Sequence, residues 1–233
     1  MKKIIASLAL CATLFIGFNA YCQQGKWAGL VKYKMTWTGN VPQQVPQEWQ
    51  TKIYNNLEGN IDLSTLGLGK TIANSDNNTV LSLFDFSQIP MDGITGKWFV
   101  KSKMKDEDLK SGKYEYTGKT KVIAGKTCQE VKVTFKDNET GTESHETIYV
   151  TKELGPKINL TEYPGLDAFP MEYPIKLSEE LSVTLTASEL LEGKVKEEDL
   201  LLETGYEEIS KEDLNDMLKK LFSAGGEGGS DDM

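Results

Sequence analysis

The sequence contains no arginine and a single histidine, His145, so all 26 of its cationic side chains are lysines. Without arginine, the chain lacks the planar fork that binds phosphates and guanine bases in bidentate fashion, and we expect no nucleic-acid partner. His145 is the one imidazole available to a Ser-His-Asp triad, and no G-x-S-x-G motif supplies a nucleophile. One histidine is also too few for a standard zinc site. We therefore expect a protein that is not an enzyme, with no catalytic residues, no metal site and no cofactor.

The 35 acidic residues leave one catalytic alternative open. A glycoside hydrolase needs only two suitably spaced carboxyl groups. Nothing in the sequence singles out two of them, so this alternative has no named residues.

Cysteine is scarce as well, since the chain has only Cys11, Cys22 and Cys128. The first two belong to an N-terminal segment that has a basic start, followed by an uncharged apolar run over residues 4–18. This is the pattern of a secretory signal peptide, and the run is shorter than the roughly 20 residues of a membrane-spanning helix. We predict a signal peptide over residues 1–22, export to the periplasm or the extracellular space, and no transmembrane segment in the mature chain.

Two alternatives concern the same N-terminal segment. Acylation of Cys22, or of Cys11, would give a lipid-anchored outer-membrane form, and an uncleaved segment would act as an anchor. Tyr21 and Leu10 precede these cysteines where a lipoprotein signal prefers a small residue, so simple secretion is favoured. After cleavage Cys128 is alone, which excludes an intrachain disulfide and predicts a small buried hydrophobic residue.

The formal net charge of −9 is unevenly distributed along the chain. Residues 178–233 hold 16 acidic residues and 5 lysines, whereas residues 23–177 hold 19 of each. The acidity of the C-terminal quarter favours solubility, and binding of divalent ions or of a basic partner is the alternative.

The stretch from Trp27 to Trp37 alternates with period two, which is typical of a β-strand. One of its faces is aromatic and apolar and the other is partly lysine, so we expect one buried side and one wet side. Further strands are predicted over residues 79–86, 97–103, 113–116, 127–135, 146–151, 170–177 and 182–188. Residues 40–50 and 136–145 are predicted to be loops, and His145 falls in the second of them.

Residues 51–63 are predicted to form two strands joined by a turn near Glu58-Gly59-Asn60. Turn chemistry is also present over residues 74–78. With the strands above, this pattern predicts that residues 23–209 form one mainly β domain built on an antiparallel sheet.

One helix is predicted over residues 210–224. Ser210 is a good N-cap, and Asp213 three residues later gives an acidic variant of the capping box. Acidic residues crowd the first turn and two lysines end the last, as the helix dipole favours. An apolar stripe suits packing on the domain, with partner binding as the alternative: Leu214, Met217, Leu218, Leu221 and Phe222. Gly225 ends the helix, and residues 225–233 are predicted to be a disordered tail.

The aromatic residues are the one feature that suggests a ligand. Trp27, Tyr33 and Trp37 share a strand face, and Trp98 and Phe99 lie in another strand. Residues of this kind either pack in a core or line an apolar cavity enclosed by a strongly curved sheet. These five are the candidate ligand-binding residues, and a purely structural role in the core is the alternative.

Five segments, taken in order, resemble a family of exported proteins of Gram-negative bacteria known as a domain of unknown function. That family is similar to the lipoprotein-carrier (LolA/LolB-like) superfamily. The matching segments are WAGLVKY at 27–33, GKTKVIAGKTC at 118–128, IYVTKELG at 148–155, FPMEY at 169–173 and GY at 205–206.

The resemblance implies an incomplete antiparallel β-barrel curved over helices, with an apolar concave face that takes acyl chains. It implies no catalytic residues. We therefore expect an exported, non-enzymatic protein of the cell envelope that binds a lipid, a lipoprotein acyl chain or another apolar ligand in a half-barrel cavity. The alternative is a structural or interaction module with a solid core, whose surface binds an envelope protein.

Overall fold

The computed structural model describes residues 27–62, 69–87, 95–136 and 142–224. The predicted signal peptide and the predicted disordered tail lie outside these residues. Within them, no helix is long and apolar enough to cross a membrane.

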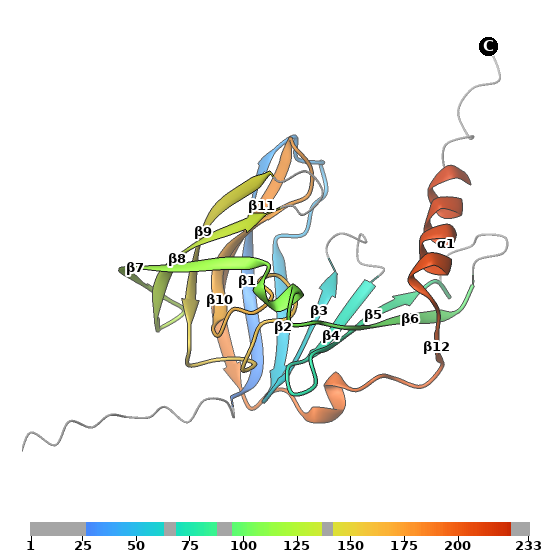
Figure 1. Cartoon of the computed structure of the whole chain (residues 1–233), viewed down its shortest axis with the longest axis horizontal. Coiled ribbons are helices and arrows are strands. Elements are labelled where there is room, and N and C mark those ends of the chain that lie inside the picture. The colour runs from blue at the N-terminus through green and yellow to red at the C-terminus, as the bar shows by residue number, and fades with distance from the viewer. Residues whose placement is uncertain (1–26, 63–68, 88–94, 137–141, 225–233) are drawn as a thin grey trace, which may run out of the picture.

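The described residues form one open, curved sheet of twelve strands (Figure 1). The strands are paired in the order β12-β6-β5-β4-β3-β2-β1-β11-β10-β9-β8-β7, and every pair is antiparallel except β12 with β6. The strand bounds are β1 Ala28–Gly39, β2 Glu48–Tyr54, β3 Leu57–Asp62, β4 Gly69–Asn74, β5 Thr79–Asp85, β6 Lys97–Lys103, β7 Gly112–Ile123, β8 Lys126–Lys136, β9 Glu143–Thr151, β10 Phe169–Lys176, β11 Leu181–Glu192 and β12 Tyr206–Glu208.

The helical elements are few. Within the described part of the chain there is one α-helix, α1 (Lys211–Ala224), together with two short 3₁₀ helices, η2 (Asp108–Lys110) and η3 (Glu197–Leu200). The prediction of a mainly β protein built on a curved antiparallel sheet is therefore confirmed. A sheet wrapped over several helices is not what the described residues form.

Strand β1 follows the alternation seen in the sequence. Val31, Tyr33 and Met35 are buried, whereas Lys34 and Thr36 between and beside them are exposed. The strand lies between β2 and β11 and pairs with both. Its apolar face belongs to the main core, or main cluster, a set of buried apolar residues from β1, β2, β7, β8, β9, β10, β11 and residues 154–168. Period-two patterning sets the face of a strand because successive side chains point to opposite sides.

The turn predicted near Glu58-Gly59-Asn60 is wrong. The two strands are joined instead by Asn55 and Asn56, between the paired residues Tyr54 and Leu57. Asn55 has a φ of 55°, in the left-handed region that asparagine tolerates better than most residues. As a result, Glu58 lies inside β3 rather than at an exposed turn.

The loop predicted around His145 is also wrong at that residue. His145 lies in β9 opposite Thr134 of β8, and the hydroxyl of Thr134 is 3.0 Å from Nδ1 of His145. Its side chain is exposed. Strand β9 begins at Glu143, so the hairpin connection is shorter than the sequence suggested.

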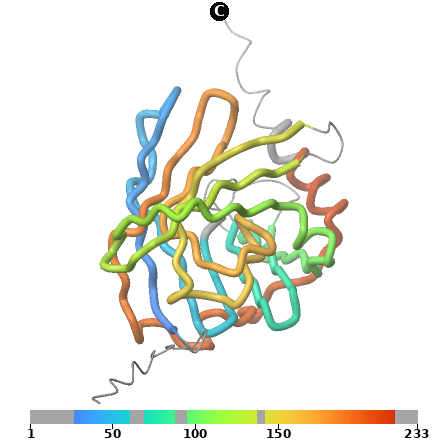
Figure 2. The backbone as a smooth tube through the Cα atoms, turned by 60° about the vertical axis from the view of Figure 1, so that its left-hand side comes forward, coloured from blue at the N-terminus to red at the C-terminus, as the bar shows by residue number. Residues whose placement is uncertain are grey.

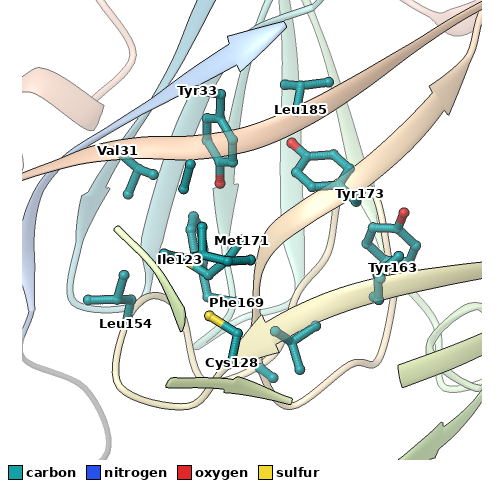
Figure 3. Packing of buried hydrophobic residues seen from close by; sticks show 14 of the residues in the cluster. Val31, Tyr33, Ile123, Cys128, Leu154, Tyr163, Phe169, Met171, Tyr173 and Leu185 are labelled. Atoms are coloured by element: carbon teal, nitrogen blue, oxygen red, sulfur yellow. The ribbon is translucent and has the colours of Figure 1, made fainter. Parts of the chain in front are cut away.

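An irregular segment between β9 and β10 fills the main concavity of the sheet. This interior segment, residues 152–168, contains no strand and no helix. It nevertheless contributes Leu154, Tyr163 and Leu166 to the same buried cluster as β1 and β10. Figure 2 shows the segment in yellow and orange beneath β8, and Figure 3 shows Leu154 and Tyr163 on either side of Phe169 and Met171.

Asn159 holds the interior segment in shape. Its side-chain Oδ1 accepts hydrogen bonds from the backbone N–H groups of Tyr163 (2.8 Å) and Thr161 (3.2 Å). Its backbone N–H donates to Leu166, and its backbone carbonyl accepts from Gly165. Because only 2% of Asn159 is exposed, the N-x-T triplet that it begins cannot carry a glycan in the folded protein.

The C-terminal helix α1 has a capped N-terminus and packs its apolar face on the sheet. The Ser210 hydroxyl accepts from the backbone N–H of Asp213 at 3.0 Å, as predicted for the N-cap, and donates to the Asp213 carboxylate at 2.8 Å, so the carboxylate contacts the Ser210 side chain and not its backbone N–H as in a capping box. Leu214 is buried against β5 and β6, and Met217 and Leu218 are half-buried beside it. The side chains of Leu221 and Phe222 lie outside the described residues.

Cys128 is a free, fully buried thiol within the main cluster, as its isolation in the sequence predicted. Burial raises the pKa of this thiol, which keeps it protonated and unreactive. It therefore contributes to packing like a small hydrophobic residue.

If the interior segment is part of the core, shortening one of its buried side chains should lower the stability of the protein substantially. Leu166 is 1% exposed, so Leu166→Ala should lower the free energy of unfolding by about 2–5 kcal/mol, measured by urea denaturation. Leu202→Ala is the matched control, since 37% of Leu202 is exposed and its loss should change stability by less than about 0.5 kcal/mol. Equal effects of the two substitutions would show that the segment does not belong to the core.

Candidate functional site

The five aromatic residues predicted to bind a ligand do not form one surface. Tyr33 is 1% exposed and lies inside the main cluster, with Trp27 and Trp37 half-buried against the same cluster. The Trp37 indole donates to the backbone carbonyl of Pro46 at 2.8 Å, and this bond fixes the indole at the edge of the main cluster. This group is therefore in or around a filled core.

Trp98 and Phe99 are successive residues of β6 and face opposite sides of the sheet. Trp98 pairs with Phe84 of β5, and Phe99 pairs with Leu83. Only the Trp98 side carries the second apolar cluster. Phe99 is thus separated by the sheet itself from the other residues of the predicted site.

A second apolar cluster lies under α1, apart from the main core. Its buried members are Phe84, Phe86, Val100 and Leu214, and its half-buried members are Trp98, Ile209, Met217 and Leu218. The rings of Phe84 and Phe86 lie parallel, with centroids 6.1 Å apart. Half of this cluster is supplied by α1 and by the residues leading into it, so the helix is its cover.

A buried carboxyl group lies between the two clusters on the same side of the sheet. Glu58 is 4% exposed, and its Oε2 atom has no hydrogen-bond partner. Burial raises the pKa of this carboxyl from 4.5 to about 8, and the charge of Glu162 adds to the increase. The Thr161 hydroxyl lowers the pKa in part.

The surroundings of Glu58 are polar although they are buried. Asn60 shares its face two residues along β3, and Thr51 of β2 pairs with Asn60. Thr161 and Glu162 of the interior segment are half-buried on its other side. We call these five residues the Glu58 cluster: Thr51, Glu58, Asn60, Thr161 and Glu162.

Three tyrosines of the main cluster lie beside the Glu58 cluster. The Tyr33 hydroxyl donates to the carbonyl of Pro170 at 2.8 Å, and the Tyr33 ring meets the Tyr173 ring edge-on at 5.8 Å. Burial raises the pKa of both phenols well above 10, so they stay neutral. Tyr163 continues the contact, with its ring centroid 5.8 Å from that of Tyr173.

Unsatisfied polar atoms gather around this cluster. Besides Glu58 Oε2, the Thr161 hydroxyl and the Asn159 side-chain nitrogen are buried without a hydrogen-bond partner. A buried polar atom without a partner costs about 1–3 kcal/mol, so a concentration of them indicates a position that a polar group from elsewhere can fill. Among the described residues, no set of three or more His, Cys, Asp or Glu side chains is placed to hold a metal ion.

Two hollows on the described surface have a different character. One of about 460 Å³ is lined mainly by charged and polar side chains around His145, including Lys113, Glu115 and Lys132. A smaller one of about 270 Å³ lies over the interior segment, between Lys152, Lys157 and Asp167. These open, charged hollows do not resemble the apolar pockets that hold lipids.

Comparison with protein-family models and with curated proteins finds no match to this chain.

Sequence reasoning missed Glu58 because it misplaced one turn. The signal that would have found it is the Asn55-Asn56 pair, which is a two-residue hairpin connection. With the turn there, the following strand places Glu58 and Asn60 on one face with Thr51, and a glutamate on a buried face is unusual enough to suggest a function.

The Glu58 carboxyl should make stability depend on pH. Its pKa is higher in the folded than in the unfolded state, so its contribution is complete below about pH 4.5 and is lost as the pH rises through about 8. At about 1.4 kcal/mol per pKa unit, the loss has an upper limit of about 5 kcal/mol. Urea unfolding of the wild type should therefore show falling stability between these pH values, and Glu58→Gln should flatten the fall. The exposed Glu179→Gln is the control and should leave the slope unchanged; a Glu58→Gln slope equal to the wild type's would contradict the account.

Proposed function

We propose that this protein is an exported, non-enzymatic binding protein of the cell envelope that holds an acyl chain of a lipid or lipoprotein against the concave side of β5 and β6, beneath α1. The observation that carries the proposal is the second apolar cluster, which is separate from the main core and which, among the described residues, is covered by helix α1. An acyl chain needs such an apolar surface and no catalytic group.

The main concavity is not available for a ligand. Leu154, Tyr163 and Leu166 of the interior segment occupy it, and they are as deeply buried as the strand residues that they contact. Any apolar ligand would have to displace part of the core, at the expense of well-packed contacts. The acyl chain is therefore assigned to the other half of the sheet, and Tyr33, Trp27 and Trp37 are structural in this proposal.

Helix α1 is attached in a way that suits a removable cover. The chain before it is fixed by β12, which has three residues, and by a hydrogen bond from the Ile209 N–H to the Phe99 carbonyl at 3.0 Å. Among the described side chains of α1, Leu214 is the buried one. Glu212, Asp216 and Lys219 are exposed. An alkyl chain that enters between α1 and the sheet contacts the apolar faces of both, so both faces stay out of water.

Export and family membership are part of the proposal. Export rests on the basic start and apolar run of residues 1–18. The resemblance to the lipoprotein-carrier superfamily supports an acyl chain as the ligand, and the open curved sheet agrees with it in outline. Fold resemblance by itself does not fix function, and the second cluster is therefore the main support for an acyl-chain ligand.

The second candidate function is an interaction module with a solid core and no small ligand. The filled main concavity favours this function, because the interior segment occupies the space that a ligand would need. The acidic residues of the C-terminal quarter would then contact a basic partner in the envelope. The two functions differ in whether the region beneath α1 takes up an acyl chain.

A nitroxide-labelled long-chain alcohol, which has a neutral head group, distinguishes the two functions. If its alkyl chain enters beneath α1, it lies next to Trp98 and should quench tryptophan fluorescence with saturation at one equivalent. Trp98→Phe should remove most of the quenching, whereas Trp37→Phe, which removes a tryptophan at the edge of the main cluster, should retain it. Saturable quenching that is insensitive to Trp98→Phe would place the ligand elsewhere, and an absence of saturable quenching would favour the interaction module.

A further inference from the structure

The Glu58 cluster and the second apolar cluster share one side of the sheet. Strand register pairs Glu58 with Ala73 of β4, Ala73 with Val80 of β5, and Val80 with Ser102 of β6. Trp98 lies four residues from Ser102 along β6 and therefore on the same face. Three strand spacings across and four residues along separate Glu58 from Trp98 by about 20 Å on the sheet, a distance suited to an extended amphiphile.

The surface between the two clusters is built from small side chains. Ala73 and Val80 lie in the row that begins at Glu58, and Thr71 and Ser82 lie in the neighbouring row that begins at Asn60. Thr71, Val80 and Ser82 are only half-buried, in contrast to Glu58 and Asn60. This strip joins the polar cluster to the apolar one without a bulky residue or a charge.

We infer that the Glu58 cluster binds the head group of the proposed amphiphile, and that this head group carries a primary ammonium or a similar cationic hydrogen-bond donor. The inference rests on the proposed function, since the acyl chain beneath α1 defines the rest of the ligand. An ammonium would give Glu58 Oε2 the hydrogen bond that it lacks, with the Thr161 hydroxyl beside it as a further acceptor.

Charge favours a cation over other head groups. The groups that shift the pKa of Glu58 are the Glu162 carboxylate and the Thr161 hydroxyl, and neither is positive. The phenols of Tyr33 and Tyr173 nearby stay neutral. A carboxylate or phosphate head group would add a third acid to this site, whereas an ammonium pairs with the ionised form of Glu58.

Proton release accompanies this mode of binding. Without a ligand, Glu58 is mostly protonated at pH 7, because its pKa is about 8. An ammonium beside the carboxyl favours its ionised form, so binding at pH 7 should release up to one proton. A neutral head group would release none.

The test uses three probes with the same dodecyl chain: dodecylammonium, dodecanol and dodecanoate. Affinities are measured by isothermal titration below the micelle-forming concentrations, in physiological salt so that non-specific attraction to the acidic protein is screened. We expect dodecylammonium to bind about tenfold or more tightly than the other two, as a charge-assisted hydrogen bond implies. Titrations in two buffers of different ionisation enthalpy should report the released proton.

Variants separate the head group from the chain. Glu58→Gln should reduce the preference for dodecylammonium to about twofold or less and abolish proton release, while Glu179→Gln should change neither. Thr161→Val is a second variant, at a half-buried position, and should weaken dodecylammonium binding several-fold with dodecanol binding unchanged.

The outcomes also separate this inference from the proposed function. If all three probes bind equally well and Glu58→Gln has no effect, the acyl-chain site stands and the head-group assignment is overturned. A preference for dodecanoate would overturn it as well. If none of the probes binds, the proposed function itself fails, and the unpartnered atoms of the Glu58 cluster then hold only water.

Discussion

The fold depends on satisfying the backbone of a buried segment that is neither strand nor helix. Buried N–H and C=O groups require partners, and an irregular segment cannot obtain them from a ladder. Asn159 solves this problem locally, because its amide oxygen and its two backbone groups together make four hydrogen bonds within residues 159–166. The Tyr114 hydroxyl adds a fifth contact with the segment, donating to the Pro164 carbonyl at 2.8 Å. With its polar groups satisfied, the segment can present Leu154, Tyr163 and Leu166 to the sheet.

The position of this segment divides the concave side of the sheet into two parts. Over β1, β10 and the strands beyond them, the segment and the strands form a closed core. Over β5 and β6, the cover is α1, which is reached through the short strand β12. Glu58 lies where the two parts meet, with the interior segment on one side and the small residues of β4 and β5 on the other. The division separates the deepest aromatic residues, which pack in the closed core, from the half-buried Trp98, which is proposed to contact a ligand.

The sequence predicted those parts of the fold that have a regular period or a local rule. Alternation identified β1 and its buried face, and the Ser210–Asp213 pair identified the start of α1. The interior segment has neither a period of two nor a helical period, so nothing local distinguishes it from an exposed loop. Its burial results from tertiary contacts of Leu154, Tyr163 and Leu166 that no sequence period encodes.

The candidate site was less predictable than the fold. Aromatic content selected Tyr33 and Trp98 together, although one lies in the filled core and the other in the second cluster. Alternation alone would have separated Trp98 from Phe99, since neighbours in a strand face opposite sides. Glu58 was hidden by a turn assigned three residues too late, and its unpartnered oxygen is a property of the packed structure only.

Hydrogen exchange of the full-length protein, followed by mass spectrometry of its peptides, tests most directly whether one part of the concave side is permanently filled and the other has a removable cover. Amides of residues 159–166 that donate within the interior segment should exchange only through global unfolding, as slowly as those of β1 and β10. Amides of α1 should exchange through local opening, faster by orders of magnitude. Protection of α1 equal to that of β1, or fast exchange of the interior segment, would contradict the account.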